Sequence, residues 1–127
     1  MIRVRGVWPT TRTLPNEELA GLYGSAWVFC LPSSYEGFGI PYAEAMAAGC
    51  PVLATRNPGA VEVTENGRFG VLAEPEELGG VIVRLLSDGD ERARLSRAGL
   101  ERARRYDLGT VCDAYEALYT RLIEARG

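Results

Sequence analysis

The sequence predicts an α/β fold in which a parallel sheet is flanked by helices. Two short apolar segments, Trp27–Leu31 and Pro51–Thr55, show no polar alternation, which is typical of strands covered on both faces. Helical patterns separate these segments and fill the chain from Glu76 onward, and strands that alternate with helices pair in parallel through right-handed crossovers. Since 127 residues suffice for one domain, we expect a single Rossmann-like sheet with flanking helices over residues 1–127.

The N-terminal third contains the first predicted elements. Residues 2–5 read as a strand ending at Gly6, and residues 7–13 as a loop. A helix is expected to begin at Pro15, because Glu17 and Glu18 complement the dipole of its first turn. Trp27 directly precedes the next strand and is expected to pack in the core.

The middle of the chain alternates strand and helix signals. Pro41 is expected to open a helix over Tyr42–Ala48, and Gly49 to close it. The strand that ends at Thr55 is followed by a predicted turn at residues 57–59, and residues 70–73 form the last short strand.

Three helices are expected after residue 76. The apolar spacing predicts them around residues 78–86, 91–105 and 111–122. Asp88 and Asp90 form a DxD pattern between the first two, which we interpret as a turn in which Asp90 caps the second helix. We predict no metal site.

Composition excludes several classes of chemistry. All 14 basic residues are Arg, so a histidine base, a Lys Schiff base, a P-loop lysine and a Ser-His-Asp triad are absent. The net charge of −3 without charge runs disfavours a nucleic-acid partner. Cys30, Cys50 and Cys112 form no CxxC pair. With no signal peptide and no transmembrane stretch visible, a reduced, cytoplasmic protein is expected.

A glycine-rich loop joins the apolar strand at residues 27–31 to the next helix. Gly37 and Gly39 permit a tight turn and a close approach of backbone amides to a ligand. The helix start offers unpaired amides and a positive dipole end, which suits a phosphate. Because Pro41 has no N–H, the donors are expected to be Gly39, Ile40 and Tyr42.

Two carboxylates bracket this turn. Glu36 lies in the loop and Glu44 near the start of the helix. Carboxylate oxygens accept hydrogen bonds from vicinal hydroxyls, so both acids are expected to hold sugars on either side of a diphosphate. Tyr35 and Tyr42 are either acceptor contacts or packing residues with a solvated hydroxyl.

The Glu36-x7-Glu44 motif, written EGFGIPYAE, follows LPS and precedes AMAAG-PV. This segment resembles the family-4 (group 1) retaining glycosyltransferases, in the donor-binding C-terminal half of their GT-B fold. The resemblance runs from about Ile2 to the C-terminus, and includes the Asn57…Gly59…Glu62 stretch and the GRFGVL run.

The resemblance implies roles for individual residues. Glu36, the catalytic candidate, would contact hydroxyls of the transferred sugar. Phe38 and Gly39 would present amides to that sugar, and Ile40 with its neighbours Gly37 and Tyr42 would face the diphosphate. Glu44 would hold the ribose. Transfer would proceed by same-face displacement, in which the leaving diphosphate helps to deprotonate the acceptor. No cofactor is implied, since the nucleotide sugar is a substrate.

The resemblance also implies missing parts. In the family, an Arg and a Lys that clamp the diphosphate lie well before the motif, in a segment that this chain is expected to lack. The first two strand-helix units and the N-terminal acceptor domain are expected to be missing as well. If residues 2–5 form the third strand and residues 27–31 the fourth in the order 3-2-1-4-5-6, the sheet would have a gap between them. Another chain or the rest of a longer polypeptide would fill this gap, or the chain would repair the edge by swapping or rearranging. The isolated chain is then expected to have little or no transfer activity, in a bacterial enzyme of polysaccharide or glycoconjugate biosynthesis. A non-catalytic nucleotide-sugar-binding module or accessory subunit is the alternative.

Overall fold

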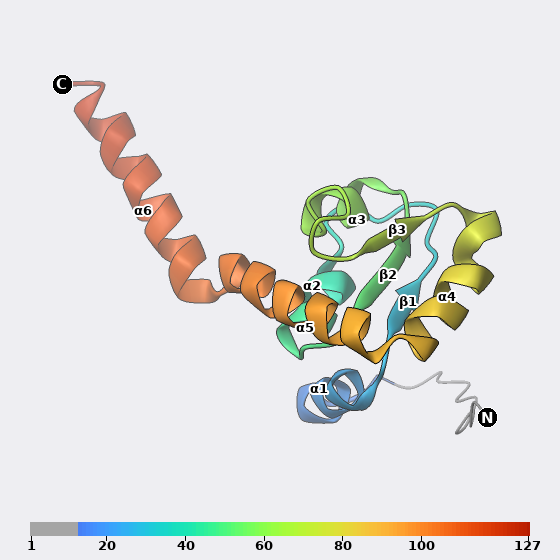
Figure 1. The fold of residues 1–127 in the computed structure, drawn as a ribbon. Helices are drawn as coiled ribbons and strands as arrows, with labels where there is room; N and C mark the ends of the chain where they lie inside the picture. The colour runs from blue at the N-terminus through green and yellow to red at the C-terminus, as the bar shows by residue number, and fades with distance from the viewer. Residues whose placement is uncertain (1–12) are drawn as a thin grey trace.

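The computed structural model describes residues 13–127. The strand expected at residues 2–5 and nearly all of the following loop lie outside the described residues. The elements, in chain order, are α1 (Asn16–Ser25), β1 (Phe29–Leu31), α2 (Ile40–Ala47), β2 (Val52–Thr55), α3 (Pro58–Val63), β3 (Val71–Ala73), the 3-10 turn η1 (Pro75–Glu77), α4 (Leu78–Ser87), α5 (Gly89–Ala103), the 3-10 turn η2 (Arg104–Tyr106) and α6 (Leu108–Glu124) (Figure 1).

The three strands form one parallel sheet in the order β1-β2-β3, which confirms the predicted α/β architecture. Leu53 of β2 is the register partner of Cys30 on one side and of Val71 on the other. Every residue of β2 is buried, as expected for a strand covered on both faces. Strand β1 is also covered on both faces, since Phe29 and Leu31 pack against one hydrophobic cluster and Cys30 against the other. Its residues are only half-buried, because its outer edge has no strand partner among residues 13–127.

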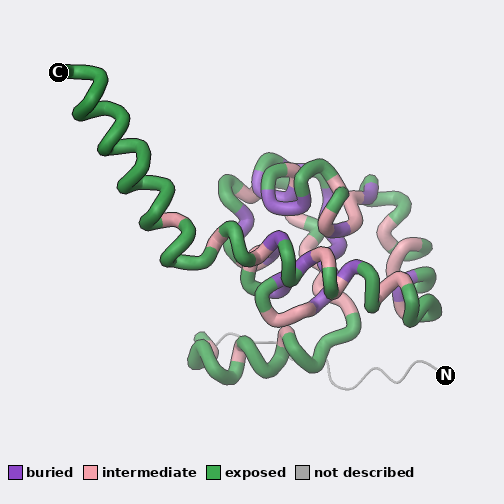
Figure 2. Tube along the Cα trace, turned by 60° about the vertical axis from the view of Figure 1, so that its left-hand side comes forward, coloured by how far each residue is buried: buried purple, intermediate pink, exposed green. Residues whose placement is uncertain are grey.

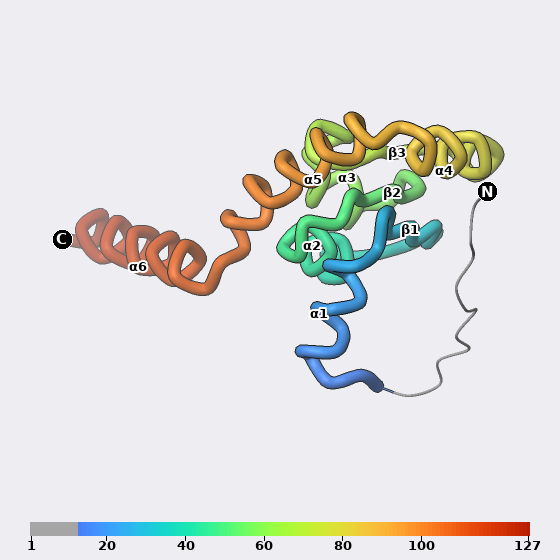
Figure 3. The backbone as a smooth tube through the Cα atoms, turned by 60° about the horizontal axis from the view of Figure 1, so that its bottom comes forward, coloured from blue at the N-terminus to red at the C-terminus, as the bar shows by residue number. Residues whose placement is uncertain are grey.

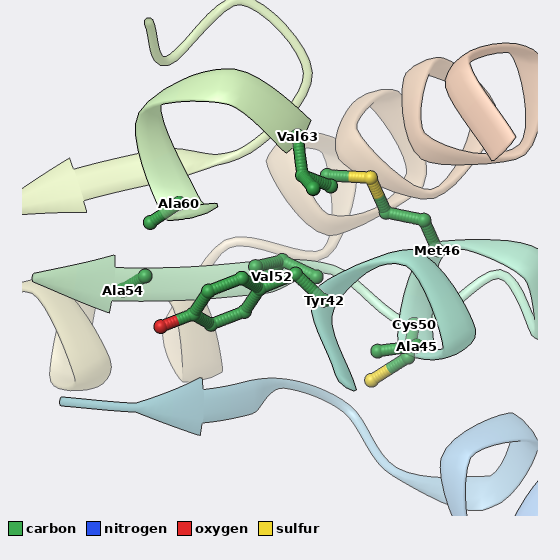
Figure 4. Packing of buried hydrophobic residues seen from close by; sticks show 8 residues of the cluster. All are labelled: Tyr42, Ala45, Met46, Cys50, Val52, Ala54, Ala60 and Val63. Carbon is green, nitrogen blue, oxygen red and sulfur yellow. The ribbon is translucent and has the colours of Figure 1, made fainter. Parts of the chain in front are cut away.

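Side chains of β2 alternate between two hydrophobic clusters. Val52 and Ala54 pack under α2 and α3 in the larger cluster (Figure 4), whereas Leu53 packs against Leu85 of α4 and Leu95 of α5 in the smaller one. The larger cluster comprises Tyr42, Ala45, Met46, Cys50, Val52, Ala54, Ala60 and Val63. The sheet is therefore the middle layer of a three-layer α/β/α arrangement.

Helix α2 begins earlier than predicted but has the expected terminal signals. Its N-cap is Gly39, with φ of 83°, and Pro41 lies in the first turn. At the other end Gly49 has φ of 75° and donates to the carbonyl of Met46, while Cys50 donates to that of Ala45. This pair of hydrogen bonds is a Schellman motif, which a left-handed glycine permits.

Two helix starts differ from the sequence predictions. Residues 57–59 do not form an isolated turn, because the Asn57 side chain accepts a hydrogen bond from the Ala60 amide and begins α3. At α5 the capping residue is Asp88, which accepts from the Glu91 amide, and Asp90 lies in the first turn. An N-cap side chain accepts from the amide two or three residues ahead. Since the bonded amide belongs to Glu91, the first acid of Asp-Gly-Asp is the cap.

Trp27 does not join the core. Its side chain is 60% exposed and lies under the guanidinium of Arg92, 4.3 Å from the ring centroid. Arg92 also donates to the carbonyls of Leu85 and Leu86 at the end of α4. This cation–π contact joins the segment before β1 to α5.

Helix α6 projects away from the rest of the molecule (Figures 1 and 3). None of its residues is buried (Figure 2), although Tyr115, Leu118 and Leu122 form an apolar stripe along it. In the part of the chain that the structure describes, no helix is both long and apolar enough to span a bilayer.

Candidate functional site

The glycine-rich loop runs from the carboxyl end of β1 to the first turn of α2 and packs against the start of α3. The Gly59 amide donates to the Glu36 carbonyl at 2.6 Å. A Cβ atom on Gly59 would lie 2.7 Å from that same oxygen and 2.8 Å from the Gly39 nitrogen, closer than real contacts allow. The absence of a side chain at Gly59 is therefore what lets the loop approach α3.

A buried polar network holds the beginning of the loop. Asn57, only 4% exposed, donates from Nδ2 to the Ser33 carbonyl, the Thr55 carbonyl and the Tyr42 hydroxyl, each at 3.1 Å. Thr55 Oγ1 donates to the same Ser33 carbonyl at 2.7 Å. Because buried polar groups are costly unless paired, these contacts fix where the loop leaves β1.

Glu36 is half-buried at the centre of this loop. Its Oε1 accepts a hydrogen bond from Ser33 Oγ at 3.1 Å, and its backbone carbonyl is bonded to Gly59. Both the carboxylate and the main chain of Glu36 are therefore oriented by neighbouring residues.

The loop amides that precede the helix remain available. Within residues 13–127 the amides of Gly37, Phe38, Gly39 and Ile40 donate to no acceptor. Gly37, Phe38 and Ile40 are exposed, whereas Gly39 is buried with its nitrogen beside Gly59. The exposed amides and the dipole of α2 make this turn suitable for an anion.

Tyr42 does not supply the free amide that the sequence suggested. Its N–H donates to the Gly39 carbonyl at 3.0 Å, because it already belongs to the first helical turn. Its side chain is fully buried (Figure 4), and its hydroxyl donates to the Leu31 carbonyl at 3.2 Å. Burial raises the pKa of this hydroxyl above its ordinary value, so the phenol keeps the proton that it donates. Of the two alternatives for Tyr42, packing is the one observed, but the expected solvated hydroxyl is wrong, because this group is buried and bonded to Leu31 and Asn57.

Glu44 lies on the exposed face of α2, one turn beyond Ile40. Its Oε2 accepts from the Tyr23 hydroxyl at 3.5 Å. Burial and the nearby Glu44 carboxylate raise the pKa of Tyr23, so the phenol remains a neutral donor. This hydrogen bond from Tyr23 of α1 to Glu44 of α2 links the two helices.

A cavity of about 670 Å³ lies beside α2, within the range of small-molecule pockets. Phe38, Ile40 and Glu44 are among the residues that line it, so the structure brings these three predicted residues together. Glu36 does not line this cavity.

Other lining residues of the cavity come from a region that the sequence analysis did not select. They include Arg104 and Tyr106 of η2 and Asp107. Tyr106 meets Phe38 edge-on, with ring centroids 5.7 Å apart, and its hydroxyl has no hydrogen-bond partner among the described residues. No local signal marks these residues, because only the packing of α5 on α2 brings them to the loop.

The described residues contain no cluster of carboxylates and thiols of the kind that binds a metal ion. No group of three or more His, Cys, Asp or Glu side chains is close enough to hold a metal ion there. The DxD pattern is used at the start of α5 instead, where Asp88 caps the helix.

Comparison with known proteins identifies the family. The family model described as "Glycosyl transferases group 1" matches residues 10–102. The chain therefore belongs to the group 1 glycosyltransferases, which confirms the family resemblance of the Glu36-x7-Glu44 segment at this level.

Three relatives illustrate the similarity. The MMP alpha-(1→4)-mannosyltransferase of Mycolicibacterium hassiacum is 44% identical over 98 residues, covering 74% of this chain and 24% of that protein. The D-inositol 3-phosphate glycosyltransferase of Corynebacterium urealyticum is 34% identical over 111 residues, or 85% and 26%. The O-antigen chain mannosyltransferase B of Escherichia coli is 35% identical over 96 residues, or 73% and 25%. The chain spans about a quarter of the length of these relatives.

Proposed function

We propose that this chain binds a nucleotide-diphosphate sugar and forms the donor half of a retaining glycosyltransferase that transfers a hexosyl unit to an acceptor. Membership of the group 1 family and relatives named as mannosyltransferases support glycosyl transfer. The observation that carries the donor assignment is the exposed turn before α2, where free amides lie between Glu36 and Glu44.

The roles of the residues follow from their chemistry. The amides of Phe38 and Ile40, with the dipole of α2, stabilise negative charge on a diphosphate as it leaves. Glu44, exposed beside the cavity, accepts from the ribose hydroxyls, and Glu36 accepts from hydroxyls of the hexose. Gly37 and Gly39 keep side chains away from the ligand.

In the proposed reaction the acceptor hydroxyl attacks the anomeric carbon on the face from which the diphosphate departs. The bond to the diphosphate breaks, the new glycosidic bond forms on that face, and the proton of the acceptor passes to a diphosphate oxygen. The configuration is therefore retained. The acceptor would be held by a further part of the protein, since the segment matched by this chain makes up only 24–26% of the relatives' length.

Calorimetric titration with UDP, GDP and ADP, each alone and as its hexose conjugate, tests the proposal. One nucleotide series is expected to bind, and Glu44→Gln is expected to weaken it about tenfold, since a hydrogen bond to a charged group is worth about 1.5–3 kcal/mol. Glu101→Gln, an exposed acid on α5, is the matched control and should bind as the wild type does. Absence of binding to every nucleotide, or equal affinity for Glu44→Gln, contradicts the assignment.

Retention has a separate test on the complete enzyme. Nuclear magnetic resonance of the first product formed should show the anomeric configuration of the donor sugar. An inverted product would contradict same-face displacement while leaving the donor-binding proposal intact.

A further inference from the structure

We propose that the segment from Thr55 to Gly59 positions Glu36 for the transferred sugar, which makes Thr55, Asn57 and Gly59 positioning residues for the donor. This inference rests on the proposed function, in which Glu36 contacts the hexose. It adds a set of residues, on β2 and the start of α3, that never touch the ligand themselves.

The first support acts on the residue that holds the Glu36 carboxylate. Ser33 donates from Oγ to Glu36 Oε1 at 3.1 Å. The carbonyl of Ser33 in turn accepts from Thr55 Oγ1 at 2.7 Å and from Asn57 Nδ2 at 3.1 Å. Two buried donors thus fix the peptide whose side chain orients the acid.

The second support acts on the Glu36 main chain. The Gly59 amide donates to the Glu36 carbonyl at 2.6 Å. Gly59 also leaves no room for a side chain, since an added Cβ would lie 2.9 Å from the Phe38 carbonyl carbon. Position 59 therefore sets how closely the loop approaches α3.

Both supports are tied to one rigid unit. Asn57 caps α3 through Oδ1, which accepts from the Ala60 amide at 2.8 Å, while its Nδ2 reaches Ser33. Ala60 is fully buried and belongs to the larger core cluster. The position of Glu36 is thereby fixed by contacts that lead to the hydrophobic core, and not only by its own exposed loop.

These contacts concern Glu36 and leave Glu44 aside. Glu44 is carried by α2 and contacted by Tyr23 of α1. Loss of the Thr55 and Asn57 supports should consequently impair sugar recognition and spare recognition of the nucleotide. A purely structural role would not produce this separation.

The experiment uses Thr55→Val, Asn57→Ser and Gly59→Ala in the full chain. Valine removes the Thr55 hydroxyl at equal size, serine keeps a capping oxygen but loses the donor to Ser33, and alanine inserts a Cβ against the loop. The measured quantity is the ratio of affinities for the nucleotide hexose and for the free nucleoside diphosphate. We expect each variant to lower this ratio about tenfold, as Glu36→Ala does. Thr55→Val and Asn57→Ser should change the affinity for the free diphosphate less than about twofold, whereas Gly59→Ala should also weaken binding of the diphosphate, because its Cβ presses on Phe38 and Gly39.

Two controls separate positioning from general destabilisation. Gly80→Ala makes the same substitution on α4, where nothing lies within 4 Å of the added atom. Val63→Ala removes buried volume from α3 and lowers the melting temperature without touching the loop. Both should keep the wild-type ratio. Gly59→Ala combined with Glu36→Ala should lower the ratio no further than Glu36→Ala alone.

The outcomes are distinguishable. Wild-type binding of the nucleotide hexose, with an unchanged ratio in those of the three variants that fold, overturns the inference and leaves the proposed function standing. An equal loss of affinity for the hexose and the free diphosphate in Thr55→Val and Asn57→Ser also overturns it, because the supports then act on the whole site. If the wild type binds no nucleotide, the proposed function fails and the inference fails with it.

Discussion

The guanidinium of Arg102 joins α5 to the carboxyl end of α3. Arg102 is 6% exposed, donates from Nε to the Val63 carbonyl at 3.0 Å and from Nη2 to the Glu62 carbonyl at 2.8 Å. The ring of Phe69 lies 5.5 Å from the guanidinium carbon. The last carbonyls of a helix lack hydrogen-bond donors within that helix. Arg102 provides donors to two of these carbonyls from a different helix.

We therefore predict that Arg102→Ala lowers the free energy of unfolding by about 2–3 kcal/mol, since two carbonyls lose a charged donor. Urea denaturation measures this value. Arg97→Ala, an exposed position of the same helix, should change it by less than about 0.5 kcal/mol. Equal effects at the two positions would contradict the role of Arg102.

Cys50 follows α2 and is almost completely buried at 2% exposure. Burial raises the pKa of its thiol from 9.0 to about 11, because the thiolate is poorly solvated there. The folded chain therefore retains the Cys50 proton at a pH where the unfolded chain has released it. By linkage, this group costs stability only as pH rises above about 9.

Between pH 9 and 11 we expect the wild type to lose about 2 kcal/mol more stability than Cys50→Ala does. Below pH 8 the difference between the two proteins should be constant. Chemical denaturation across this pH range provides the measurement. Cys112→Ala, at an exposed position on α6, should follow the wild-type pH dependence, and parallel curves for Cys50→Ala and the wild type would refute the expectation.

At the scale of elements, the start of α5 shows how one side chain decides a boundary. Asp88 accepts from the Glu91 amide at 2.9 Å, and Glu91 in turn pairs with Arg94 at 2.7 Å. Hydrogen bonding to Arg94 lowers the pKa of Glu91. Asp90 makes no capping contact and adds only its charge near the helix dipole.

Replacement of Asp88 by alanine should lower the free energy of unfolding by about 1 kcal/mol, the usual value of an N-cap. Replacement of Asp90 by alanine should cost about 0.3 kcal/mol, as expected for a first-turn acid. Thermal denaturation of the two variants distinguishes these effects. A larger loss of stability for the Asp90 variant than for the Asp88 variant would identify Asp90 as the cap instead.

At the scale of the whole molecule, α6 is separate from the packed body. It has no buried residue and contacts mainly the preceding turn η2. Its large side chains Tyr115, Leu118 and Leu122 are 56%, 40% and 54% exposed, so they contribute little to either hydrophobic cluster.

A chain ending at Asp107 is therefore expected to unfold within about 3 °C of the full chain, because little apolar area is lost from the core. Differential scanning calorimetry compares the two lengths. Leu95→Ala, which opens a cavity in the smaller cluster, serves as the contrast and should cost about 2–5 kcal/mol. A fall in the melting temperature on truncation as large as that of Leu95→Ala would show that α6 supports the body.

Features with local causes were predictable from the sequence. Pro41 and Gly49 bracket α2 in both the prediction and the structure, since the residue types themselves favour helix ends. The continuous apolar run of β2 likewise indicated a strand covered on both faces. The turn at residues 57–59 was mistaken, because whether Asn57 caps a helix depends on where its oxygen points.

The candidate site could be proposed from residue types, whereas its geometry could not be predicted. The motif identified Glu36 and Glu44, yet nothing in it places Glu36 outside the cavity that Glu44 lines. Tyr42 was assigned a free amide although the helix begins two residues before it. Arg104 and Tyr106 were missed because they lie some sixty residues beyond the loop.

The sequence by itself determined the order of strands and helices, the family, and the two acids that flank the glycine turn, because each depends on residue types at short spacing. Only the tertiary structure decided which groups share a cavity and which hold Glu36 in place. The contacts of Asn57 and Gly59 with the loop form when parallel strands align their carboxyl ends. That alignment is a property of the packed sheet, and hydrogen bonds across it cannot be read from residues more than twenty positions apart.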